Sequence, residues 1–121
     1  MTIEYTRLIV RDLRVSMPIG IYEQDKKETC ALIINLTADV QLPENWVADR
    51  YENVVCYARL RQMVLDVTGQ GHLNLVETLA ETIAARCFEW PQVSAVTVRV
   101  EKASIFPDCI PGVEIARVRP R

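Results

Sequence analysis

Alternation of hydrophobic and polar side chains predicts a β-strand at Cys30–Val40. One face of this segment carries the apolar side chains Leu32, Ile34, Leu36, Ala38 and Val40. An earlier strand is predicted at Thr6–Met17, where hydrophobic residues alternate less regularly with charges, and residues 18–21 then mark a turn. Two later strands are predicted from the alternation of Val96, Val98 and Val100 and from residues 113–118.

The period changes between these two pairs of strands. From about Tyr57, four apolar residues recur at the spacing of an amphipathic helix, namely Leu60, Met63, Val64 and Val67. Gly69 and Gly71 close this helix. A second helix is predicted from Leu75, with the buried stripe Val76, Leu79, Ala80, Ile83 and Cys87. Residues 43–53 are polar and predict a loop.

The order strand, strand, helix, helix, strand, strand predicts an α+β fold, in which two helices lie on one face of an antiparallel four-stranded sheet. A length of 121 residues predicts a single domain over residues 1–121. The helix-free face still carries Ile9, Ala31 and Ile33. Because an exposed apolar sheet face usually marks an interface, the pattern also favours oligomerisation.

Composition narrows the function classes. Half of the residues are hydrophobic and a quarter are charged, which is typical of a globular protein. The net charge of −2 without a basic block argues against a nucleic-acid partner. Apolar stretches are too short for a membrane span, and the charged start does not resemble a signal peptide, so a cytoplasmic location is expected.

The cysteines and the histidine give little support for a metal or cofactor site. The four cysteines form no CxxC pair, so reduced thiols are expected. The only histidine is His72, which leaves few ligands for zinc. His72 either contacts a ligand or belongs to a turn, and the second interpretation is favoured. Cys30 and Cys56 are interpreted as small buried hydrophobes.

Lys102 is the most informative polar residue. It continues the parity of Val98 and Val100, so its side chain should point to the core face at the end of the strand. Taken alone, this pattern favours a lysine whose stem packs at the rim of the core while the amine reaches water. The alternative is a partly desolvated amine with a lowered pKa that is suited to proton transfer.

Glu77 also has two interpretations. Asn74 and Glu77 stand three residues apart, as in a capping box with Asn74 as the N-cap. The alternative is a carboxylate that accepts two hydrogen bonds from an amidine-like edge. Capping is favoured for the residue alone. Likewise, Tyr57 is interpreted as a core-edge aromatic with a bonded hydroxyl, and Asp25 as a solvated loop residue.

Five segments, in order along nearly the whole chain, resemble the dihydroneopterin aldolase family. They are IGIYEQD after the first strand, VVCYARL, NLVETLAETIA, VRVEK and GVEIAR. The resemblance implies the tunnelling fold. It also implies that four subunits close their sheets into a barrel, that two such rings stack into a homo-octamer, and that active sites lie between neighbouring subunits.

The resemblance also implies roles for individual residues. Glu77 would bind the pterin through its 2-amino group and ring N–H, with backbone groups near Val55 and Val76 on the rest of the ring edge. Lys102 would be the central acid/base residue. Tyr57, from the neighbouring subunit, would relay or orient a proton.

Three further residues complete the implied site. Ile21 and Tyr22 would contact the substrate, and Asp25 stands where the family usually has Glu, near the lysine. The implied reaction is retro-aldol cleavage of 7,8-dihydroneopterin in folate biosynthesis, without a metal or organic cofactor. The alternatives are an epimerase acting on dihydroneopterin or its triphosphate, and a non-catalytic pterin-binding paralogue. The chain departs from the family pattern at Asp25, at Cys30 in place of Gln, and at Ala103 and Pro111.

Overall fold

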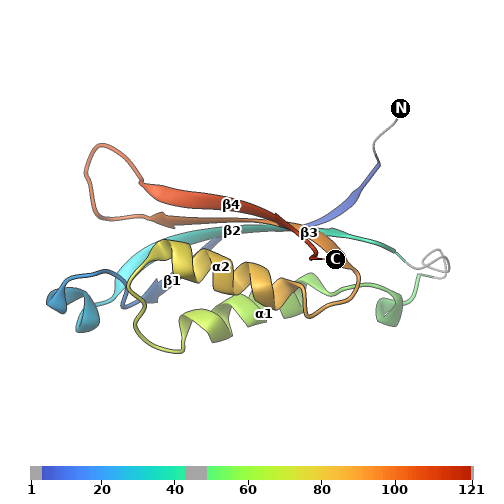
Figure 1. The fold of residues 1–121 in the computed structure, drawn as a ribbon, viewed down its shortest axis with the longest axis horizontal. Helices are drawn as coiled ribbons and strands as arrows, with labels where there is room; N and C mark the ends of the chain where they lie inside the picture. Colours follow the sequence, from blue (N-terminus) through green and yellow to red (C-terminus); the bar gives the residue numbers. More distant parts are fainter. Residues whose placement is uncertain (1–3, 43–48, 121) are drawn as a thin grey trace.

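The computed structural model describes residues 4–42 and 49–120. Four antiparallel strands form one sheet in the order β1-β2-β3-β4, namely β1 (Thr6–Met17), β2 (Cys30–Val40), β3 (Val93–Lys102) and β4 (Gly112–Val118). Helices α1 (Tyr57–Thr68) and α2 (Val76–Cys87) cover one face of this sheet (Figure 1). The α+β prediction is therefore confirmed.

Two of the connections contain a helical turn. A 3-10 turn, η1 (Glu23–Lys26), lies between β1 and β2, and another, η3 (Tyr51–Asn53), precedes α1. The predicted loop at residues 43–53 is thus interrupted by a helical turn, and its residues 43–48 lie outside the described residues.

A β-bulge explains why the alternation in β1 is irregular. The register with β2 shifts between Val10 and Leu13, and Asp12 has a positive φ of 58°. The Asp12 N–H donates to Asn35 Oδ1 at 2.9 Å, so the backbone group freed by the bulge keeps a partner. Because the bulge adds one residue, Val10 and Leu13 can both face the helices although their spacing is odd.

The core lies between the sheet and the two helices. Every residue of the apolar set predicted for β2 is buried, as are Val96, Val98 and Val100 of β3. The predicted stripe of α1 is buried as well. In α2 the stripe is buried from Leu79 onward, whereas Val76 is only half-buried. The helix stripes and the alternating strands are therefore assigned to the correct faces.

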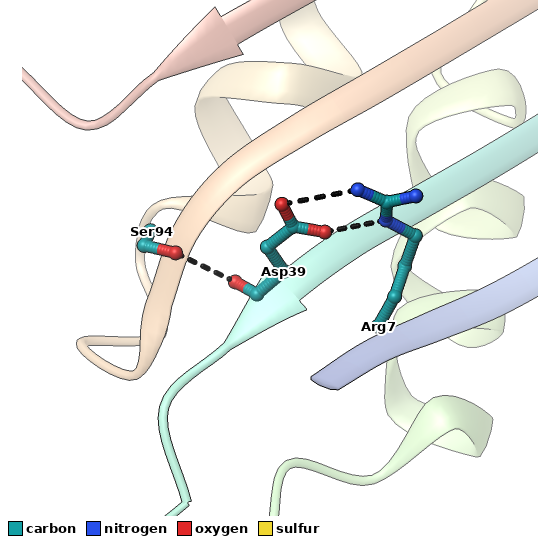
Figure 2. A network of polar contacts seen from close by, with 3 residues as sticks. All are labelled: Arg7, Asp39 and Ser94. Carbon is teal, nitrogen blue, oxygen red and sulfur yellow. Dashed lines mark hydrogen bonds and ion pairs between the residues drawn. The ribbon is translucent and has the colours of Figure 1, made fainter. Parts of the chain in front are cut away.

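The helix-free face is more polar than expected. Ile33 keeps only 9% of its surface exposed, so it adds little to an apolar patch, while Ile9 is 61% exposed. Ion pairs cross this face between neighbouring strands, and in one of them Arg7 Nε donates to Asp39 Oδ1 at 2.5 Å (Figure 2). Ser94 Oγ also donates to the Asp39 carbonyl at 3.2 Å. Charged pairs therefore lie on this face beside the apolar side chains expected from the sequence.

The start of α2 differs from the prediction. Leu75 is the N-cap residue, and no side chain caps this helix end. Asn74 is one residue before the N-cap position and therefore does not cap the helix. The capping-box interpretation of Asn74 and Glu77 is therefore wrong, and the Glu77 carboxylate is not tied to the helix end.

Candidate functional site

The loop after β1 is attached to the turn that precedes α2. Ile19 forms a parallel bridge with Leu73. The Gly20 N–H donates to the Leu73 carbonyl at 3.0 Å, and the Leu73 N–H donates to the Pro18 carbonyl at 3.3 Å. These bonds hold the loop that follows Gly20 beside the first turn of α2, although the two segments are some fifty residues apart in the chain (Figure 1).

The loop folds back on itself at Gly20. Gly20 has a φ of +141°, and a Cβ added there would lie 2.2 Å from Asp25 Oδ2. Both the backbone conformation and the close approach therefore require glycine. Asp25 Oδ2 accepts the Tyr22 N–H at 3.0 Å. Asp25 is half-buried and bound to the backbone, so its interpretation as a solvated side chain is wrong.

A cavity of about 300 Å³ opens where this loop, α2 and the end of β3 meet. Six of the eight predicted site residues line it: Ile21, Tyr22, Asp25, Val76, Glu77 and Lys102. Sequence analysis did not select Gly20, Leu75 or Ile105, which line the same cavity. Ile105 follows Lys102 in the β3–β4 connection, but no periodic pattern there indicates its direction.

Lys102 lies where strand parity predicted. It pairs with Leu32 at the end of β3, and its side chain is half-buried at the rim of the core. Within residues 4–42 and 49–120, no carboxylate lies within 4 Å of its amine, as judged from the ion pairs present. Lys102 therefore lines the cavity without an ion pair to a described carboxylate.

Glu77 stands in the first turn of α2 and is exposed toward the cavity. The partial positive charge of the helix start stabilises a carboxylate at this position. The cavity therefore combines an ammonium group and a carboxylate with the apolar side chains of Ile21, Leu75 and Ile105. A mostly apolar wall with a few polar groups is typical of a small-molecule site.

Tyr57 and Val55 do not reach this cavity. They line a second cavity of about 560 Å³, together with Thr6, Leu8, Val40, Leu42, Tyr51, Val54, Cys56 and Ala58. Because α1 and α2 run in opposite directions, the start of α1 lies at the other end of the helix layer from the start of α2 (Figure 1). Tyr57 is 68% exposed, so its interpretation as a core-edge aromatic is wrong.

The cysteines are free thiols with different environments. Cys30 and Cys56 are half-buried, so the prediction that both are buried hydrophobes is wrong. A hydrogen bond from Tyr51, with help from the Arg59 backbone, lowers the pKa of Cys56. Burial raises the pKa of the Cys87 thiol to about 12.

Among the described residues, no group of three or more His, Cys, Asp or Glu side chains is placed to hold a metal ion. Within the same part of the chain, none of the helices has the length and apolar character needed to cross a bilayer.

The arrangement of the sheet and helices defines a class that several solved structures share. A putative dihydroneopterin aldolase from Vibrio cholerae has a TM-score of 0.88 at 25% identity, covering 97% of this chain and 100% of that one. A Burkholderia dihydroneopterin aldolase, bound to guanine, has a TM-score of 0.83 at 34% identity and covers 96% and 93%. Urate oxidase of Bacillus subtilis, at 11% identity and a TM-score of 0.65, covers 93% of this chain and 46% of its own and shares the fold alone.

Sequence comparison identifies the family. The family model for dihydroneopterin aldolase (FolB) matches residues 8–116, and the chain belongs to this family. The Bacillus subtilis dihydroneopterin aldolase is 31% identical over 84 residues, which cover 69% of this chain and 70% of that protein. The Methylorubrum extorquens dihydroneopterin aldolase is 28% identical over 99 residues, covering 81% and 76%.

Proposed function

We propose that this chain cleaves 7,8-dihydroneopterin into 6-hydroxymethyl-7,8-dihydropterin and glycolaldehyde, as an aldehyde-lyase of folate biosynthesis. Family membership supports the reaction class. The observation that carries the proposal is the cavity in which Lys102, Glu77 and Asp25 converge from three separate segments of the chain.

Binding of the pterin is assigned to the first turn of α2. The Glu77 carboxylate accepts hydrogen bonds from the 2-amino group and the adjacent ring N–H, a bidentate and charge-assisted pairing. Backbone groups near Val76 bind the remaining ring edge, since the first N–H groups of a helix have no intrahelical partner. Ile21 and Tyr22 contact the substrate from the loop after β1.

Lys102 is assigned the proton transfers. Removal of the proton from the second side-chain hydroxyl lets the bond between the first and second side-chain carbons break, which releases glycolaldehyde. The bonding electrons move into the ring C=N next to the side chain, and the ring nitrogen is protonated. The enamine carbon then takes a proton while the ring nitrogen gives its proton back, which restores the ring C=N and gives the hydroxymethyl product. Because the substrate carries its own imine, no Schiff base to lysine is needed, and the Lys102 amine, the Tyr57 hydroxyl and ordered water suffice.

The second copy of the chain supplies the rest of the site. Tyr57 and Val55 lie in another cavity, and Tyr57 is exposed, so a single chain cannot place them beside Lys102. Among the described residues, β1 and β4 each pair with only one strand, which leaves both sheet edges open. Edge-to-edge closure of four chains into a ring, with two rings in a homo-octamer, removes these edges.

A cytoplasmic location is proposed from the state of the cysteines. All four cysteines are free, which suits the reducing cytoplasm.

Turnover by the purified protein is the direct test. Incubation with 7,8-dihydroneopterin should release glycolaldehyde and 6-hydroxymethyl-7,8-dihydropterin in equal amounts, measured by trapping the aldehyde and by chromatography of the pterins. The same chromatogram detects interconversion of side-chain stereoisomers, the signature of an epimerase. A protein that binds the pterin but gives neither product nor stereoisomer would contradict an enzymatic role. A stable monomer in solution would contradict a site shared between copies.

A further inference from the structure

His72 has no role in the proposed reaction, yet it contacts the loop that forms the site. It lies in the turn between α1 and α2 and does not line the cavity. Its Nε2 lies 2.8 Å from the Gly20 carbonyl oxygen, across 52 residues of sequence. Because a carbonyl oxygen only accepts hydrogen bonds, Nε2 must carry the proton and donate.

This bond completes the attachment of Gly20. The Gly20 N–H is bonded to the Leu73 carbonyl at 3.0 Å, so both backbone polar groups of Gly20 are held by the turn before α2. Among the described residues, His72 is the only donor bonded to the Gly20 oxygen. Gly20 is buried, so loss of this donor would leave a buried carbonyl without a partner, which is unfavourable.

The backbone conformation of Gly20 also determines how the loop that follows lies against the cavity. Its φ of +141° turns the chain so that the Asp25 carboxylate packs against it and accepts the Tyr22 N–H. A change in the peptide plane of Gly20 would therefore move Ile21 and Tyr22, which line the cavity. His72 can therefore affect the position of Ile21 and Tyr22 through its hydrogen bond to Gly20.

We propose that His72 is a positioning residue for the pterin site, which holds the Gly20 peptide so that the loop at residues 20–26 lies against Glu77 and Lys102. This inference rests on the proposed aldolase function, because its effect is read as substrate affinity. His72 acts through the loop and does not touch the substrate or transfer its protons.

Two substitutions of His72 distinguish loss of the hydrogen-bond donor from a change in side-chain shape. His72→Phe keeps a planar ring and removes the donor, and His72→Gln keeps an N–H donor of similar reach. His72→Phe should raise KM for 7,8-dihydroneopterin roughly fivefold, the order expected for one hydrogen bond, and change kcat less than about twofold. His72→Gln should restore most of the wild-type KM. Hydrogen exchange at the Tyr22 amide should be faster in His72→Phe than in His72→Gln.

The controls keep the outcomes distinct. Gln70→Ala changes an exposed residue of the same turn and should leave KM unchanged. If His72→Phe does not fold, His72→Asn takes its place, because its shorter amide cannot reach the Gly20 oxygen. A KM equal to wild type in the donor-free variant, or the same KM rise in the Gln variant, would overturn the inference. An inactive wild-type protein would instead overturn the proposed function.

Discussion

The two ends of the helix layer are built differently. At the start of α2, the cavity is small, about 300 Å³, and the loop that forms one of its walls is held by backbone hydrogen bonds to a distant segment. At the start of α1, the cavity is larger, about 560 Å³, mostly apolar, and bordered by the exposed ring of Tyr57. The first end carries the Lys102 ammonium group and the Glu77 carboxylate and is open to water. The second has an aromatic wall without a charged anchor. In the proposed assembly, these two ends of neighbouring copies form one site.

Removal of the Lys102 amine should give the largest effect. Lys102→Ala should lower kcat by about 10²- to 10⁴-fold, the usual range for a general acid/base, while pterin affinity falls far less. Glycolaldehyde release and equilibrium binding of the pterin measure the two quantities. Lys27→Ala removes the same charge from the exposed connection before β2 and should be close to wild type. Equal activity of both variants would exclude Lys102 as the acid/base residue.

Mixed assemblies test whether the two ends meet between copies. Lys102→Ala and Tyr57→Ala chains, each weakly active alone, should regain activity when they are co-expressed. With random assembly into a symmetric ring, about a quarter of the sites would contain both native residues. Activity per chain in the purified mixture measures this fraction. No gain over the separate variants would contradict a site that Lys102 and Tyr57 of two copies share.

Neutralising Glu77 should have an intermediate effect. Glu77→Gln should weaken pterin binding by roughly 10- to 100-fold, because hydrogen bonds to a charged group are lost. The melting temperature should change little, since Glu77 does not cap α2. Glu81→Gln is the matched control, because it removes a carboxylate one turn later, outside the cavity, where it pairs with Arg117. Unchanged affinity in Glu77→Gln would show that the pterin is anchored elsewhere.

The smallest expected effect concerns Cys56 at the apolar end. The hydrogen bond from Tyr51 lowers the pKa of Cys56. Tyr51→Phe should therefore raise this pKa, reduce the thiolate fraction at pH 8 and slow alkylation by iodoacetamide. Peptide mass spectrometry measures the rate, and Cys87, whose pKa burial raises to about 12, serves as the unreactive reference. Faster alkylation of the variant would contradict this sign.

Local pattern predicted most of the fold. Apolar residues repeat every second position in a strand with one buried face and every three to four positions in an amphipathic helix. The buried faces of β2, β3 and α1 therefore follow directly from the sequence. The same logic placed Lys102 at the core rim, because parity continues to the end of β3. The start of α2 was wrong because the apolar Leu75 takes the N-cap position that Asn74 was expected to fill.

The site was less accessible to such reasoning. Asp25, Glu77 and Lys102 come together only because the loop after β1 bonds to the turn before α2, a contact that no periodic signal encodes. Their grouping came from the resemblance to a family. The distance of Tyr57 from them is likewise a property of the folded chain.

The bulge in β1 makes chain length itself a constraint. Side chains on either side of Arg11 and Asp12 can be exchanged within their polarity class, because each half of the strand keeps its own alternation. A one-residue deletion between the halves is different, since it would rotate one half and turn its apolar side chains to the helix-free face. In this protein, Asp12 therefore acts as a spacer, and its φ of 58° limits the position to residues that tolerate the left-handed region.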